Sequence, residues 1–181
     1  MDAEEYLTEH WIKNRIWTHL QRPRHQNRLR TCASYLEGQN FLDVGCALGH
    51  STRELKNYRN GYWSGLEFHK ETVEKAIINF PDIRFYHAEN FDLLSACGRQ
   101  FDGVVCSEVI EHVEDDGAFI KGLIEIARKV LVITTPCAWV NDPGHLRLYS
   151  KRSLFNLFNG HNFRITKDKY FFYGITRINN A

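Results

Sequence analysis

The chain has 181 residues, 43% of them hydrophobic and 25% charged, which is the composition of an ordinary globular protein. Its length suits one domain, and its formal net charge of +1 gives no overall attraction to a polyanion. The five cysteines are scattered and form no C-x-x-C pair, which argues against a zinc ribbon and a disulfide framework. We therefore expect a single domain over residues 1–181 with reduced cysteines.

No apolar run in the chain approaches the length needed to cross a bilayer. The first ten residues, MDAEEYLTEH, are acidic and polar and do not resemble a secretory signal peptide. Together with the cysteine pattern, these features predict a cytoplasmic protein with no membrane partner. They do not indicate an oligomeric state.

Two helices are expected before the first strand, as an N-terminal part (residues 1–38) ahead of a core (residues 39–181). The first covers residues 4–20, by the helical spacing of its apolar side chains. The second follows Pro23, which interrupts the pattern, and runs to about Leu36.

The expected N-terminal helices are rich in basic residues. Between His10 and Leu36 the chain has no Asp or Glu but has six cations: Lys13, Arg15, Arg22, Arg24, Arg28 and Arg30. The simplest interpretation is a solvated helix surface. The functional alternative is a rim that attracts an anionic acceptor such as RNA or a phosphorylated metabolite.

From residue 40 onward, apolar runs of strand length alternate with amphipathic segments. The expected strands are 40–44, 62–66, 83–87, 101–106 and 130–134, with a closing pair at 163–172 and 173–178. The expected helices are 51–58, 73–80, 118–129 and 151–159, and residues 91–94 begin a short connection. This alternation predicts an α/β fold with a seven-stranded, mainly parallel sheet and helices on both faces.

A glycine turn follows the first expected strand, in the stretch FLDVGCALGHST (residues 41–52). Gly45 ends the apolar run, Gly49 comes four residues later, and a helix-compatible segment follows. Glycine allows positive φ angles and lets a ligand approach the backbone closely. The N–H groups at the start of the next helix then face the space above the turn, so the stretch predicts a nucleotide site.

Glu67 ends the second expected strand, 24 residues after Asp43. A carboxylate there can accept two hydrogen bonds from a ribose diol, which is why nucleotide-binding α/β folds carry one at this place. The alternative is a solvated loop carboxylate. Because ligands of such sheets bind at the carboxyl ends of the strands, Glu67 and Gly45 are expected to border one cleft.

The turn also distinguishes between nucleotide-binding families. A dinucleotide fingerprint would need glycine where the chain has Ala47 and His50, and a P-loop would need a Gly-Lys-Ser/Thr sequence that is absent. The chain resembles the Rossmann-like methyltransferases that use S-adenosylmethionine (SAM). Their motif D/E-x-G-x-G-x-G corresponds to residues 43–49, with Ala47 in place of the middle glycine.

The resemblance covers roughly residues 40–165. Within the family, the chain is similar to the ubiquinone-biosynthesis-like group. GLEFHKETVEKA (65–76) resembles the second motif of the family, and FDGVVCSEVIEHVED (101–115) resembles the motif at its fourth strand. HAEN (87–90) occupies the place of an aspartate and a small residue, with His87 replacing the aspartate.

This resemblance implies a SAM site. Asp43 would hold the ammonium group of the cofactor, the glycine turn its carboxylate, Glu67 its ribose, and residues 88–90 its adenine. The residues implied to bind the cofactor are Asp43, Gly45, Cys46, Ala47, Gly49, Glu67, Phe68, Ala88, Glu89, Asn90 and Ser107.

Two histidines are candidates for the chemistry at the methyl acceptor. His112 follows the fourth strand in SEVIEH, and an imidazole of ordinary pKa is a plausible general base. His145, in the GHLRLYS loop after the fifth strand, is the second candidate. The alternative for His112 is a structural residue that bonds neighbouring backbone.

A metal-dependent alternative uses the same segment. Glu108, Glu111 and His112 would share one face if the segment is helical, and His145 would add a fourth ligand for a divalent ion. This resembles the small-RNA 3′-terminal 2′-O-methyltransferases, in which the metal activates the attacking oxygen. EVIEHV also occurs in metal-independent relatives, so the main prediction assigns no metal ligand.

The sequence therefore predicts a SAM-dependent methyltransferase acting on O or N of a small-molecule acceptor whose identity it does not give. An RNA acceptor and a non-catalytic SAM-binding protein are the alternatives, the latter suggested by Ala47 and His87. A nicotinamide-dependent oxidoreductase is disfavoured because the dinucleotide fingerprint is missing.

Overall fold

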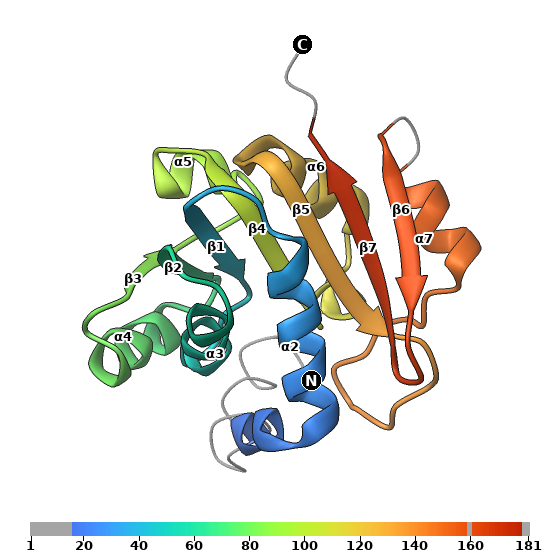
Figure 1. Cartoon of the computed structure of the whole chain (residues 1–181), viewed down its shortest axis with the longest axis horizontal. Helices are drawn as coiled ribbons and strands as arrows, with labels where there is room; N and C mark the ends of the chain where they lie inside the picture. The colour runs from blue at the N-terminus through green and yellow to red at the C-terminus, as the bar shows by residue number, and fades with distance from the viewer. Residues whose placement is uncertain (1–15, 159–160, 179–181) are drawn as a thin grey trace.

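One seven-stranded sheet forms the centre of the computed structural model, which describes residues 16–158 and 161–178 (Figure 1). The strand order is β3-β2-β1-β4-β5-β7-β6. Neighbouring strands from β3 to β5 are parallel, while β7 runs antiparallel to both β5 and β6. The strands are β1 (Asn40–Val44), β2 (Tyr62–Glu67), β3 (Arg84–His87), β4 (Phe101–Ser107), β5 (Ala127–Pro136), β6 (Phe163–Lys167) and β7 (Phe171–Arg177).

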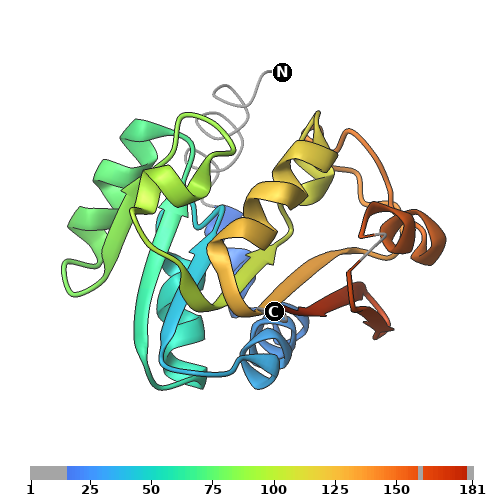
Figure 2. The ribbon, with the colours of Figure 1, turned by 90° about the horizontal axis from the view of Figure 1, so that it is seen from above.

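Helices cover both faces of the sheet (Figure 2). The α-helices are α2 (Pro23–Tyr35), α3 (His50–Tyr58), α4 (Lys70–Asn79), α5 (Leu93–Cys97), α6 (Asp116–Ile126) and α7 (Lys151–Leu157). Two 3₁₀ helices, η2 (Ile16–Gln21) and η3 (Ile110–His112), complete the described helices. The predicted seven-stranded, mainly parallel α/β architecture is confirmed. None of the helices described is both long and apolar enough to span a membrane.

Two apolar cores lie on opposite faces of the sheet. Side chains of α2 and α3 pack on one face with Phe41 and Val105, and those of α5, α6 and α7 pack on the other with Leu42 and Val104. These neighbouring residues belong to opposite cores because successive strand side chains point to opposite faces. The sheet therefore holds the carboxyl ends of β1, β2 and β4 side by side on a rigid base.

Several expected boundaries are wrong. The helix predicted to reach Lys129 ends at Ile126, because residues 127–129 already belong to β5 and Ala127 pairs with Phe101 of β4. The closing strands are separated by a turn at residues 168–170, where Asp168 accepts the Tyr170 and Phe171 amides, and not at residue 172.

Three further expectations about helices are corrected. The apolar residues of the expected helix 73–80 are not all buried: Ile77 is 47% exposed, and the buried face of α4 is the narrower one around Val73 and Ala76. The stretch that follows residue 91 forms α5, which the Asp92 side chain caps. Of the helix predicted for residues 4–20, only residues 16–20 lie within the described part, and they are 3₁₀ rather than α.

Candidate cofactor and methyl-acceptor site

Gly45 turns the chain at the end of β1. Its φ of 75° lies in the left-handed region, and its amide donates to the Leu66 carbonyl at 2.8 Å, which ties the turn to β2. A Cβ added at this position would lie 2.4 Å from Cγ2 of Val109. Glycine is therefore required here both for the backbone angle and for the close approach of the segment after β4.

Ala47 also adopts a left-handed conformation, with a φ of 45°, in the place where the family motif has its middle glycine. Its amide donates to Oε2 of Glu67 at 2.8 Å, a charge-assisted contact that helps to hold a conformation unfavourable for alanine. The substitution is therefore accommodated by a link between the glycine turn and the end of β2.

The amides of the glycine turn are largely used within the protein. Those of Gly45 and Cys46 donate to Leu66, that of Ala47 donates to Glu67, and that of Gly49 donates to the Cys46 carbonyl. The amides of the first helical turn lack partners within the helix. The start of α3 therefore has amides left to donate to an anionic ligand above the turn.

Asp43 lies at the base of this helix start and is only 1% exposed. Its Oδ2 accepts the Ser51 hydroxyl at 2.7 Å and the Thr52 hydroxyl at 2.8 Å. Burial raises the pKa of the carboxyl to about 6, against the opposing effect of these two hydrogen bonds. At neutral pH the group is ionised, and it places a negative charge beneath the glycine turn.

Glu67 is buried at the end of β2, at 5% exposure. Oε1 accepts the Phe68 amide at 2.7 Å, and Oε2 accepts the Ala47 amide. Burial raises the pKa of the carboxyl, and the backbone hydrogen bonds oppose that rise. Oε1 also accepts the His69 amide, at 3.4 Å. Oε2 accepts only the Ala47 amide among the described residues, so it can still accept a hydrogen bond from a ligand hydroxyl while the carboxylate holds the two loops together.

The segment after β3 is placed beside Glu67, but its amides differ in availability. The Ala88 amide donates to the Glu67 carbonyl at 3.1 Å, so it is already committed, whereas Glu89 and Asn90 are exposed. His87 contacts the carbonyl of Phe68, with Nε2 at 3.2 Å from the oxygen. The Phe68 ring packs edge-on against two aromatic rings on this side, those of Phe91 and Phe119.

His112, in η3 after β4, and His145, in the loop between β5 and α7, lie next to each other. Their ring centroids lie 4.7 Å apart, and Nδ1 of His112 lies 2.9 Å from the Gly144 carbonyl oxygen. A carbonyl only accepts, so Nδ1 carries the proton and Nε2 the lone pair in the neutral ring. Burial, aided by the nearby His145, lowers the pKa of His112 to about 4, which keeps the ring neutral at neutral pH.

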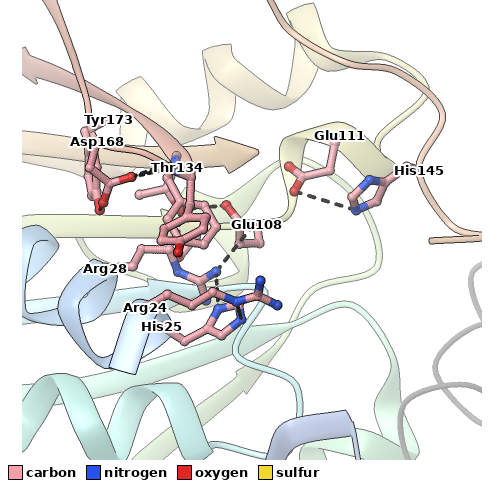
Figure 3. Close-up of polar contacts among 12 residues, drawn as sticks. Arg24, His25, Arg28, Glu108, Glu111, Thr134, His145, Asp168 and Tyr173 are labelled. Atoms are coloured by element: carbon pink, nitrogen blue, oxygen red, sulfur yellow. Dashed lines mark hydrogen bonds and ion pairs between the residues drawn. The ribbon is translucent and has the colours of Figure 1, made fainter. Parts of the chain in front are cut away.

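Glu111 joins the two histidines. It is fully buried, and both carboxylate oxygens lack a hydrogen-bond partner within the described part of the chain. Nε2 of His145 lies 4.0 Å from Oε1 of Glu111 (Figure 3). One donor atom from each of Glu111, His112 and His145 falls within 4.8 Å of the others, a spacing that suits a metal ion. Burial raises the pKa of the Glu111 carboxyl well above its usual value.

Glu108 does not join this cluster, which corrects the expectation that residues 108, 111 and 112 share a helix face. The 3₁₀ helix η3 begins only at Ile110, and Glu108 has a φ of 60°. Its Oε2 lies 3.3 Å from Nη1 of Arg28, and its Oε1 accepts the Thr134 hydroxyl at 3.1 Å (Figure 3). The predicted Ser107 lies beside it, with its Oγ 2.8 Å from Oγ1 of Thr134.

The sequence interpretation missed Arg28, which it counted among the solvated cations of the N-terminal helices. The residue is 3% exposed. Its position was readable from spacing, because the buried residues His25, Arg28, Leu29 and Cys32 follow the i, i+3, i+4, i+7 pattern of one helix face. The apolar members of that pattern identify the buried face, and Arg28 falls within it.

The seven-stranded fold is that of the Rossmann-like methyltransferases. The chain matches the model of the methyltransferase domain family over residues 16–168, and it belongs to that family. The family expected from the sequence is confirmed.

Relatives by sequence include ubiquinone biosynthesis O-methyltransferases. That of Neisseria meningitidis is 28% identical over 98 residues, which cover 51% of this chain and 41% of the relative. The mitochondrial protein of Dictyostelium discoideum is 31% identical over 113 residues, which cover 51% of this chain and 33% of the relative. The matches thus span less than half the length of these relatives.

Solved structures share the fold. The magnesium protoporphyrin IX methyltransferase of Synechocystis with bound S-adenosylhomocysteine (SAH) has a TM-score of 0.65 at 16% identity, covering 86% of this chain and 84% of that one. The methyltransferase domain of the bacterial protein CtHen1 has a TM-score of 0.69 at 18% identity, covering 84% of this chain and 98% of that one.

Proposed function

We propose that this protein is a SAM-dependent methyltransferase that acts on an oxygen of a small-molecule acceptor. The observation that carries the proposal is the contact between Glu67 and the Ala47 amide, because it places a buried carboxylate beside a left-handed glycine turn. Family membership and the O-methyltransferase names of the relatives support it. A cytoplasmic location and a single domain over residues 1–181 remain part of the proposal.

The residues present fit SAM. Asp43 supplies a negative charge beneath the turn for the cofactor's ammonium group, and the start of α3 supplies amides for its carboxylate. Glu67 has acceptor capacity left for the ribose diol. Phe68, Glu89 and Asn90 border the place expected for the adenine. SAM supplies an activated methyl group, so the protein's main task is to position the acceptor in line with it.

His112 is the proposed general base for the acceptor hydroxyl. The Gly144 carbonyl fixes the ring in the tautomer with the lone pair on Nε2, and burial keeps the ring neutral. Such a ring can accept a proton as the oxygen is methylated. The His112 ring packs against His145, which lies in the loop that follows β5 and helps to orient the His112 ring.

Replacing His112 tests this role. His112→Ala should lower the rate of methyl transfer by about a hundredfold or more, which is the contribution of a positioned base. The dissociation constant of the His112→Ala variant for SAM should stay within twofold of the wild-type value, because His112 lies away from Glu67. The exposed His161→Ala is the control and should change neither quantity. Full turnover in His112→Ala would remove the base assignment.

A metal-assisted version of the reaction is the second candidate. The buried carboxylate of Glu111, with two unpartnered oxygens, is the observation that favours it, since a buried carboxylate without a partner is costly. Glu111, His112 and His145 would hold a divalent ion, which would lower the pKa of an acceptor hydroxyl. In this version His112 is a ligand and not a base.

Manganese binding separates the two versions. The metal-assisted version predicts that Mn²⁺ binds to the wild-type protein, that Glu111→Gln weakens this binding by at least tenfold, and that EDTA abolishes methyl transfer. Glu114→Gln, an exposed carboxylate three residues away, should leave Mn²⁺ binding unchanged. Methyl transfer that persists in EDTA would contradict the metal-assisted version and leave the general-base version.

An RNA acceptor has weaker support than a small molecule. The basic N-terminal helices added slightly to the support that the metal-ligand pattern gave it, but Arg28 is buried, and Lys13 and Arg15 lie outside the described residues. The test of acceptor class is transfer of a labelled methyl group from SAM to a panel of hydroxylated aromatics, sugars, amines and short RNA. The proposal expects label in a hydroxylated small molecule, and label only in RNA would contradict it.

A further inference from the structure

Arg28 is a buried cation that joins α2 to the segment after β4. Its Nη1 lies 3.3 Å from Oε2 of Glu108 and 3.0 Å from Nδ1 of His25, and its guanidinium lies 4.8 Å from the centre of the Phe171 ring. Its Nε is buried and has no hydrogen-bond partner among the described residues. The guanidinium is therefore held in one place by its surroundings, with Glu108 as its nearest carboxylate.

Glu108 occupies a backbone conformation that needs support. A residue with a Cβ pays free energy to adopt a φ of 60°, and it keeps such an angle only where surrounding contacts hold it. Three contacts do so here. The Glu108 amide donates to the Thr134 carbonyl at 3.0 Å, the Thr134 hydroxyl donates to Oε1, and Arg28 pairs with Oε2.

The turn at Glu108 determines where the following residues lie. Val109 comes next and fills the space above Gly45, the glycine of the proposed cofactor turn. The helix η3 then delivers Glu111 and His112 beside His145. The placement of Glu111 and His112 at the proposed acceptor end therefore depends on this one turn.

We propose that Arg28 is a positioning residue of the methyl-transfer site, which acts by holding Glu108 in the turn that places Glu111 and His112. The inference rests on the proposed function. Stability alone does not account for the pair, because a buried ion pair recovers little more than its desolvation cost, and apolar residues of similar size often do as well. The pair also holds the Glu108 side chain toward α2, and Glu108 is not a member of the cluster of Glu111 and the two histidines.

A double-mutant cycle separates positioning from stability. The variants are Arg28→Met, Glu108→Gln and the double variant, and the control is Arg177→Met, which removes an exposed pair with Glu37. Four quantities are measured: melting temperature, SAM dissociation constant, hydrogen exchange of the amides of residues 108–113, and turnover with the best acceptor of the panel. Hydrogen exchange needs no acceptor, so it reports on the turn in every case.

Arg28→Met should lower the melting temperature, because it leaves the Glu108 carboxylate, whose side chain is only 20% exposed, without its charge partner. The double variant should regain much of that loss. In the double variant, amide hydrogen exchange over residues 108–113 should nevertheless be at least tenfold faster than in the wild type. Turnover of the double variant should be at least tenfold lower than that of the wild type, and its SAM dissociation constant should stay within threefold of the wild-type value. If Arg28→Met does not fold, Glu108→Gln and the double variant give the same comparison.

Wild-type exchange over residues 108–113 together with wild-type turnover in the double variant would overturn the inference and make the pair purely structural. Arg177→Met should match the wild type in all four measurements. Failure of the wild-type protein to bind SAM would instead contradict the proposed function. That result is distinguishable, because the exchange comparison is made on the protein without a cofactor.

Discussion

Glu67→Ala is expected to raise the dissociation constant for SAM by roughly five- to 150-fold, equivalent to about 1–3 kcal/mol for lost charge-assisted hydrogen bonds. Two effects contribute. The ribose loses its carboxylate partner, and the Ala47 and Phe68 amides lose the acceptor that holds the glycine turn to the end of β2. Calorimetric titration of SAM into the wild type and the variant measures the change.

The matched control for this prediction is Glu67→Gln. Glutamine keeps one carbonyl oxygen that can accept the Ala47 amide, so this variant should lose less affinity than Glu67→Ala. Removing an exposed glutamate, as in Glu37→Ala, should leave the dissociation constant unchanged. A wild-type dissociation constant in Glu67→Ala would take Glu67 out of the cofactor site.

Gly45→Ala should abolish detectable SAM binding and destabilise the fold by several kcal/mol. Two costs add up at this position. The left-handed φ of 75° costs a residue with a Cβ about 1–2 kcal/mol, and the new Cβ would lie 2.4 Å from Cγ2 of Val109. Relief of that contact requires Val109 to move, and with it the turn that carries Glu108. Urea unfolding and SAM titration measure the two effects.

Gly98→Ala separates the two costs. Gly98 has a similar left-handed φ of 66°, but a Cβ there would meet no atom within 4 Å. This variant should lose only the backbone cost of about 1–2 kcal/mol and should bind SAM like the wild type. Equal destabilisation by the two variants would mean that the contact with Val109 has no energetic weight.

Features set by local sequence were predicted well. The first strand was predicted at 40–44 and lies there, because an apolar run ending in a glycine leaves few alternatives. Helix α7 begins at Lys151, as predicted, and Ser150 and Ser153 form a reciprocal capping box before it. The boundary between α6 and β5 could not be read, because the paired β4 strand, and not local propensity, ends that helix.

The candidate site was predictable where strand ends alone position it. Glu67 and the glycine turn meet because the carboxyl ends of parallel strands lie at one edge of the sheet. The pairing of Glu108 with Arg28 was not predictable, since the two residues are 80 positions apart and lie on different elements. The assumption of a helical SEVIEH segment failed for a related reason: the contacts with Thr134 and Arg28 support a left-handed turn there.

Calorimetric titration of the wild-type protein with SAM and, separately, with NAD is the most direct test of the central claim. We expect SAM to bind to one site per chain, SAH to compete for that site, and NAD to show no measurable binding. Binding of NAD without binding of SAM would contradict the assignment of the strand-end site to a methyl donor.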